Sequence, residues 1–317
     1  MSARATTALA LLVLTLESAR ATQMTLGFSS VGLSYPFAAA IAKGFQDAAG
    51  KAGVRAIVLD AQGRVQKQAN DIDDLIGQKV SGIALMPLDS VIAQSWVDHA
   101  TAAGIPIVAV GSQVGDPRSR ALENVYPGLV ALVTQDEVAA GREAGQLAAR
   151  LLARERTANI AIIEGAPGFA EVLQRASGFR EALDANRVSY RIVASQPGDW
   201  TAEKADVTCQ NILAGHPDVD LFFSEADDMA VGCAHAVRAV GSRAKLVGIG
   251  GSKLAIVSIK AGRVDGTVCY KPEELGALAF ATLYEDVTGK KPLHAGFITY
   301  RTPGVTRADI GQCTGQW

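Results

Sequence analysis

Residues 24–60, MTLGFSSVGLSYPFAAAIAKGFQDAAGKAGVRAIVLD, contain two short apolar stretches separated by a helical pattern. The stretches MTLGFSS (24–30) and VRAIVLD (54–60) have the length and aliphatic composition of buried strands. A helix is expected between them over 37–50. Because a helical connection is too long for a hairpin, the two strands are expected to run parallel in one sheet. This stretch therefore predicts the β-α-β unit from which α/β folds are built.

The same alternation continues along the rest of the chain. We expect further strands at 82–87, 105–110, 129–135, 159–165, 188–195, 219–225, 245–250, 265–270 and 297–300, with helices at 65–79, 91–103, 136–154, 170–185, 201–214, 228–240, 252–261 and 272–288. About ten such units exceed one sheet of ordinary size. The sequence therefore predicts an α/β fold of two doubly wound parallel-sheet lobes, with ligands at the carboxyl ends of the strands.

The composition agrees with a globular chain of two domains. The 317 residues are 49% hydrophobic and 20% charged, and a domain has roughly 150 residues. The 30 basic and 32 acidic residues give a formal net charge of −2. Since proteins that bind nucleic acid normally show a basic surplus, no nucleic-acid partner is expected.

The first 21 residues have the pattern of a signal peptide. Arg4 is followed by an apolar run over 5–16 and by Ala19-Arg20-Ala21, which has the A-x-A form of a cleavage site. The run is shorter than the roughly 20 residues that span a bilayer, although a membrane-anchoring helix is the alternative. We expect residues 1–21 to be removed and the rest of the chain to be exported as a soluble protein.

Export gives the four cysteines the chance to form two disulfides in any of three connectivities. Cys209 and Cys233 each fall on the core-facing side of neighbouring predicted helices, which favours Cys209–Cys233 and Cys269–Cys313. Two buried free thiols are the alternative to the first bridge. No C-x-x-C motif occurs and the four histidines are scattered, so no metal site is expected.

No catalytic or cofactor motif stands out. The chain lacks a G-x-S-x-G elbow and a supported Cys-His pair, so an enzyme is not expected. The glycines in the stretch 248–251 lack the full G-x-G-x-x-G pattern, which argues against a dinucleotide cofactor. These glycines instead indicate a tight turn or a close approach of the backbone to a ligand.

Four segments of the chain resemble the periplasmic ribose-type sugar-binding proteins of ABC importers, members of the type 1 periplasmic binding protein superfamily. They are VGLSYPF (31–37), LQRASGF (173–179), SQPGDW (195–200) and EADDMAVGC (225–233). The resemblance implies a monomer of two lobes that close over a small ligand and dock on an inner-membrane permease.

The resemblance also implies the division of the chain. Three hinge crossings are expected near 134–135, 270–271 and 297–299. One lobe would then hold residues 22–134 plus 271–297, and the other 135–270 plus 298–317.

Four residues match positions that this family uses for its ligand. Phe37 matches an aromatic ring that stacks on the sugar, and Tyr35 stands in place of a polar Asn. Arg175 matches an arginine that donates hydrogen bonds to sugar hydroxyls, and Trp200 matches an aromatic on the opposite lobe. The alternatives are that the aromatics pack loops against the sheets and that Arg175 is a solvated charge on its helix.

The chain departs from the ribose-type pattern at other positions. Gly111-Ser112-Gln113 replaces an Asp-Arg pair, Ala226 replaces an Asn, and Tyr270 replaces a hinge-side Gln. Ser112, Gln113, Gly250 and Tyr270 are further candidates for the cleft. Asp227 or Glu225 is expected to accept hydrogen bonds there, whereas Asp228 is expected to cap its helix.

These observations predict a solute-binding protein for a monosaccharide or polyol other than ribose, without catalytic activity. A small nitrogenous cation is the alternative ligand, since aromatic faces also attract cations. The alternative to delivery to a permease is a periplasmic sensing subunit for a chemoreceptor or a sensor kinase.

Overall fold

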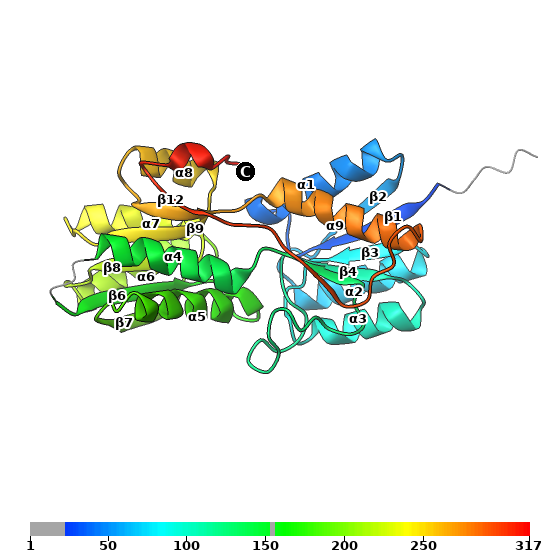
Figure 1. Cartoon of the computed structure of the whole chain (residues 1–317), viewed down its shortest axis with the longest axis horizontal. Helices are drawn as coiled ribbons and strands as arrows, with labels where there is room; N and C mark the ends of the chain where they lie inside the picture. Colours follow the sequence, from blue (N-terminus) through cyan, green and yellow to red (C-terminus); the bar gives the residue numbers. More distant parts are fainter. Residues whose placement is uncertain (1–22, 153–155) are drawn as a thin grey trace, which may run out of the picture.

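The computed structural model describes residues 23–152 and 156–317, so the expected signal peptide lies outside the described residues. The chain forms two α/β lobes side by side, each with a six-stranded sheet and helices on its faces (Figure 1). This confirms the predicted fold class. Within the described ranges, no helix is both long and apolar enough to cross a membrane.

The first sheet has the strand order β11-β5-β4-β3-β1-β2, and all its neighbouring strands are parallel. Its strands are β1 (Thr25–Ser30), β2 (Arg55–Asp60), β3 (Gly82–Leu85), β4 (Ile107–Val110), β5 (Ala131–Val133) and β11 (Gly296–Ile298). The helices of this lobe are α1 (Pro36–Lys51), α2 (Val65–Gly77), α3 (Ala93–Ala102) and α9 (Pro272–Val287).

The second sheet repeats this arrangement in the order β12-β10-β9-β8-β6-β7. Its strands are β6 (Ala158–Glu164), β7 (Tyr190–Pro197), β8 (Leu221–Ser224), β9 (Lys245–Gly250), β10 (Gly266–Cys269) and β12 (Gly304–Thr306). Its helices are α4 (Glu137–Leu151), α5 (Ala170–Ala185), α6 (Ala202–Gly215), α7 (Asp227–Ala239), α8 (Lys253–Lys260) and the 3₁₀ turn η1 (Ile310–Gln312).

The predicted strands and helices are present, with ends shifted by a few residues. Two elements were not predicted: β12, which is antiparallel to β10, and η1. The chain passes from one sheet to the other after β5, after β10 and after β11.

Both faces of each sheet are buried, as helical crossovers require. In β1, Leu26 and Phe28 pack on one face of the first sheet, whereas Ile83 and Leu85 of β3 pack on the other. The second sheet likewise separates two apolar clusters.

Glycines let paired helices approach closely. A Cβ atom on Gly44 of α1 would lie 2.0 Å from the carbonyl oxygen of Glu273 at the start of α9, and one on Gly276 would lie 1.9 Å from that of Ile41. The pair α4 and α5 is packed in the same way through Gly141 and Gly178. Side chains at these positions would push the helices apart.

Two alanine substitutions in α1 are therefore expected to change stability in opposite directions. Gly44→Ala should lower the free energy of unfolding by about 1–3 kcal/mol, because the methyl group meets backbone that cannot rotate away. Gly50 has open space around its Cβ position, so Gly50→Ala should leave stability unchanged or raise it by up to about 1 kcal/mol. Urea denaturation of both variants measures the difference, and a similar loss in both would contradict this packing.

Both predicted disulfides are present. Cys209–Cys233 joins α6 to α7 with the two Cα atoms 5.3 Å apart, and Cys269–Cys313 joins the end of β10 to the segment after η1 with a Cα separation of 5.8 Å. Free thiols at the first pair are thereby excluded.

Candidate ligand-binding site

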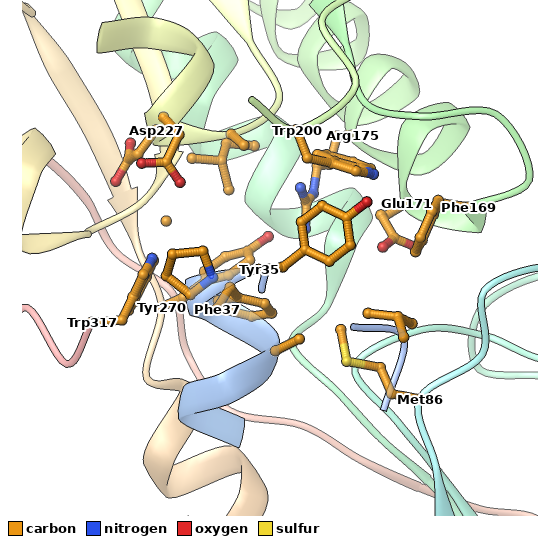
Figure 2. A pocket seen from close by; sticks show the side chains of 17 residues that line it. Tyr35, Phe37, Met86, Phe169, Glu171, Arg175, Trp200, Asp227, Tyr270 and Trp317 are labelled. Carbon is orange, nitrogen blue, oxygen red and sulfur yellow. The ribbon is translucent and has the colours of Figure 1, made fainter. Parts of the chain in front are cut away.

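A pocket lies between the two lobes, at the carboxyl ends of β1, β3, β8, β9 and β10 (Figure 2). Seven of the predicted site residues line it: Tyr35, Phe37, Arg175, Trp200, Asp227, Gly250 and Tyr270. The sequence analysis did not predict the other lining residues, which are Val31, Pro36, Ala38, Met86, Phe169, Glu171, Ala226, Asp228, Ile249 and Trp317.

Aromatic rings from both lobes form much of the wall. Phe37 at the start of α1 lies edge-on to Trp317, with ring centroids 5.4 Å apart, and 5.9 Å from Tyr270. Across the pocket, Phe169 lies edge-on to Trp200 at 5.6 Å. Figure 2 shows these two aromatic groups on opposite sides of the pocket. Such faces suit the C–H surfaces of a small ring or chain.

The backbone holds Trp200 in an unusual conformation. Its φ is 64°, in the left-handed region that bulky residues rarely adopt, and Asp199 before it has a φ of 50°. Gly165 leaves room for the indole, because a Cβ atom there would fall 1.9 Å from the ring. The indole Nε1 is buried without a hydrogen-bond partner in the described part of the chain. A buried unpaired donor beside a pocket is available to a ligand.

Arg175 is held by an ion pair with Glu137, a residue that the sequence analysis did not predict for the site. Its Nε and a terminal nitrogen donate to the two carboxylate oxygens of Glu137 at 2.7 and 3.0 Å, and its other terminal nitrogen donates to the carbonyl oxygen of Glu225 at 2.6 Å. Tyr270 Oη and Gln135 Nε2 also donate to the Glu137 carboxylate, each at 2.6 Å. The side chain of Glu137 is only 1% exposed.

This network keeps Arg175 charged inside the protein. Burial acts to lower the pKa of Arg175, but the adjacent Glu137 carboxylate holds it well above its usual value. Since a guanidinium has five N–H donors and three are used here, two are left for a ligand. The alternative of a solvated helix charge is therefore wrong. The guanidinium also lies over the rings of Trp200 and Tyr270, at 5.6 and 5.4 Å from their centroids.

Carboxyl groups complete the polar part of the wall. Glu171 is buried and accepts a hydrogen bond from Ser112 Oγ at 2.8 Å, and burial raises its pKa to about 7. Asp227 accepts from the backbone N–H of Ser252 at 2.8 Å and from Thr267 Oγ1 at 2.6 Å. Burial raises the pKa of Asp227 to about 6. Both carboxyls therefore exchange protons near neutral pH.

Of the two acids expected as acceptors, Asp227 lines the pocket and Glu225 does not, while Asp228 differs from its expected role. Asp228 lines the pocket, and its side chain makes no capping hydrogen bond in the described ranges, so its predicted cap role is wrong. Glu225 does not line the pocket: one carboxylate oxygen accepts from the N–H of Gly165 at 2.9 Å, and burial raises its pKa well above the usual value. In the described part of the chain, the carboxyl groups that line the pocket are thus those of Asp227, Asp228 and Glu171.

Ser112 and Gln113 lie at the predicted edge of the sheet but outside the pocket wall. Ser112 binds Glu171 of α5, and Gln113 accepts a hydrogen bond from Gln174 of α5. Both therefore connect the lobes instead of lining the pocket, which corrects their predicted role. At Gly250 a Cβ atom would lie 3.0 Å from an Asp227 oxygen and 3.1 Å from the Trp317 ring, so its lack of a side chain keeps the pocket open.

The raised carboxyl pKa values predict that the stability of the ligand-free chain falls as pH rises. Glu171 titrates near 7 in the folded chain against a usual 4.5, and Asp227 near 6 against 3.8. The folded chain therefore binds more protons than the unfolded chain from about pH 4 to 7, and the free energy of unfolding declines over that range. The expected slope is up to about 1.4 kcal/mol per pH unit for each proton.

Urea denaturation between pH 4.5 and 8 measures this slope. Glu171→Gln should reduce the slope, because the amide does not titrate, while leaving the contributions of Asp227 and of Glu225, whose pKa is also raised. The carboxyls whose pKa values are lowered, such as Asp220 and Asp309, act at more acidic pH and do not mask the effect. An unchanged slope in Glu171→Gln would show that Glu171 is not buried as described.

Comparison with known proteins shows what the chain is similar to. The model of a family described as periplasmic binding protein domain matches residues 26–291. The ribose import binding protein of Bacillus subtilis (strain 168) is 31% identical over 271 residues, covering 85% of this chain and 83% of that protein. The D-allose-binding periplasmic protein of Escherichia coli (strain K12) is 34% identical over 250 residues, covering 77% and 78% of the two chains.

Solved structures agree with the fold. A Caulobacter myo-inositol binding protein bound to myo-inositol superimposes with a TM-score of 0.82 at 25% identity, covering 93% of this chain and 97% of that chain. These relatives are binding proteins and not enzymes, in agreement with the prediction from the sequence. The predicted resemblance to ribose-type binding proteins is confirmed.

Proposed function

This chain belongs to the periplasmic binding protein family, and we propose that it is the solute-binding protein of an ABC importer for a monosaccharide or polyol. The observation that carries the proposal is a pocket in which aromatic rings of both lobes surround buried hydrogen-bonding groups. Phe37 and Trp200 offer faces for C–H groups. Arg175 offers N–H donors to hydroxyl oxygens, while the carboxyls accept from hydroxyl hydrogens.

The relatives support this class of ligand. Their names refer to ribose and D-allose, and the structural relative holds myo-inositol, a cyclic polyol. All three ligands are small, neutral and polyhydroxylated. The replacement of the Asp-Arg pair by Ser112-Gln113, whose side chains point to the other lobe, supports a hydroxyl pattern different from that of ribose.

Cleft closure is the proposed mode of action. The lobes would comprise residues 22–134 plus 271–297 and residues 135–270 plus 298–317, with hinges near 134–135, 270–271 and 297–299. Contacts such as Ser112 with Glu171, and the N–H of Ser90 with the carbonyl of Gly168, join the lobes across the cleft. A ligand that touches both lobes stabilises this closed form by its differential affinity, and an inner-membrane permease would then recognise that form.

The proposed location is the periplasm, after removal of residues 1–21, and the proposed state is a monomer. The family is described as periplasmic, and the sequence of the first 21 residues supports export. Two disulfides also suit an oxidising compartment.

A thermal-shift screen of the chain without residues 1–21 tests the proposal. The panel contains pentoses, hexoses, deoxy sugars, polyols and small amines. A ligand at about 100 times its dissociation constant should add roughly 2.7 kcal/mol and raise Tm by a few degrees. Amines are included because the described pocket wall contains three carboxyl groups and one guanidinium, an excess of acidic groups that could bind a cation. A Tm shift with amines alone, or no Tm shift with any sugar or polyol, would contradict the proposal.

A further inference from the structure

Residues 313–317, which follow η1, form a short segment that we call the strap. It starts at Cys313, which is bonded to Cys269 at the end of β10, and reaches the pocket at Trp317. In Figure 1 the end of the drawn chain lies between α8 and the start of α1, and Figure 2 shows Trp317 at one side of the pocket beside Phe37 and Tyr270.

The strap is fixed to both lobes. On the side of the second sheet, the N–H of Lys253 at the start of α8 donates to the carbonyl oxygen of Trp317 at 2.9 Å. On the side of the first sheet, the N–H of Glu273 at the start of α9 donates to Gln316 Oε1 at 2.8 Å. The Trp317 ring then packs edge-on against Phe37 of α1. The strap thus crosses from one lobe to the other beside the pocket.

Glycines give the strap its course. A Cβ atom on Gly251 would lie 2.6 Å from Cys313 Sγ, and one on Gly315 would lie 2.9 Å from the backbone nitrogen of Lys253. The disulfide therefore lies against the same turn, 250–251, whose first residue faces the pocket. The position of Trp317 is consequently coupled to that of the Cys269–Cys313 bridge.

We propose that Trp317 contacts the ligand and that the Cys269–Cys313 disulfide sets the ligand affinity by holding the strap in place. This inference rests on the proposed function, because it requires that the pocket bind a ligand. The anchoring of the strap is a property of the ligand-free chain. A fixed indole binds a ligand more tightly than a mobile one, because binding then costs no further conformational entropy to order the ring.

The first test measures the anchoring without any ligand. In the double variant Cys269→Ser/Cys313→Ser, amide hydrogen exchange at Lys253 and Glu273 should become faster, since both amides donate to the strap. The matched control is Cys209→Ser/Cys233→Ser, which removes the other disulfide and lowers the global stability. In this control, exchange at Lys253 and Glu273 should become faster only as much as the lower global stability requires. Unchanged exchange in the first variant would overturn the proposal whatever the ligand is.

The second test measures affinity by calorimetry with D-ribose, D-allose and myo-inositol as probes. Trp317→Ala should weaken binding about tenfold or more. Removal of the Cys269–Cys313 bridge should weaken it less, and should add little in the Trp317→Ala background, because both changes remove the same contact. Equal affinity in the chain and in Trp317→Ala would overturn the ligand contact.

The two tests separate this inference from the proposed function. If the unaltered chain binds none of the probes and shows no shift in the wider screen, the proposed function fails and the ligand contact fails with it. The exchange measurement then still decides whether the disulfide anchors the strap. If the chain binds and the control disulfide variant loses affinity as much as Cys269→Ser/Cys313→Ser, the effect is general destabilisation and the proposal is wrong.

Discussion

Replacing Glu137 with alanine is expected to lower the free energy of unfolding by about 3–5 kcal/mol, the usual cost of breaking a buried ion pair by removing one partner. The guanidinium of Arg175 would stay buried beside Trp200 and Tyr270 without its carboxylate. Tyr270 and Gln135 would also lose their acceptor. Urea denaturation followed by circular dichroism measures the loss.

Glu181→Ala is the matched control for this prediction. Glu181 also pairs with an arginine, Arg142, at 2.8 Å, but both side chains are 47% exposed. Exposed pairs contribute up to about 1 kcal/mol, so this variant should be nearly as stable as the parent chain. Similar losses in Glu137→Ala and Glu181→Ala would mean that Glu137 is solvated and that the network around Arg175 does not form.

Truncating Trp200 is expected to weaken ligand binding by tenfold to about a hundredfold, the range of an aromatic contact at the centre of an interface. The indole lies under the Arg175 guanidinium and packs against Phe169, and its N–H has no hydrogen-bond partner among the residues that the structure describes. Trp200→Ala removes the ring and the donor together. Trp200→Phe removes the donor but keeps a ring, so its affinity for the ligand should lie between those of the parent chain and Trp200→Ala. Titration of each variant with the best ligand of the thermal-shift screen gives the affinities.

The stability of the ligand-free Trp200→Ala variant separates a binding role from a core role. The Trp200 side chain is only half-buried in the ligand-free chain, so its truncation removes less packing than the loss of a core residue, and alanine keeps the same left-handed backbone. We therefore expect the melting temperature of the empty variant to stay close to that of the parent chain. A large drop in that temperature with unchanged affinity would identify Trp200 as a packing residue.

The periodicity of the sequence was enough to predict the two α/β lobes, because short aliphatic strands and helical crossovers follow from local patterns. It missed β12, which has only three residues and is antiparallel at the edge of its sheet. Its three residues, Gly304, Val305 and Thr306, include only one aliphatic side chain, so no apolar run marks the strand. Its pairing with β10 depends on where the chain returns after β11.

Part of the candidate site was predictable where residues lie between a strand and the next helix, or at the start of that helix. Tyr35, Trp200 and Asp227 occupy such positions and do line the pocket. Glu137 was missed because its surroundings come from distant parts of the chain: Arg175 lies 38 residues away and Tyr270 lies 133 residues away. From the sequence alone it is an acidic residue in the first turn of a helix, which has an ordinary role there.

Ser112 and Gln113 show the limit of reasoning from strand ends. They lie just beyond β4, as expected, but their side chains reach α5 of the other lobe. Trp317 was missed because it lies in no helix or strand, and its contacts come from Lys253 and Phe37, which are distant in the sequence.

Isothermal titration calorimetry of the chain without residues 1–21 tests the central claim most directly, namely that the pocket between the lobes binds one small sugar or polyol. The panel is D-ribose, D-allose, myo-inositol and any further sugar or polyol that raises Tm. We predict saturable binding of one ligand per chain, with a dissociation constant in the micromolar range or below, about −8 kcal/mol or stronger. The same titration of Trp200→Ala should show at least tenfold weaker binding. Saturable binding that is unchanged in Trp200→Ala, or no binding of any sugar or polyol, would contradict the account.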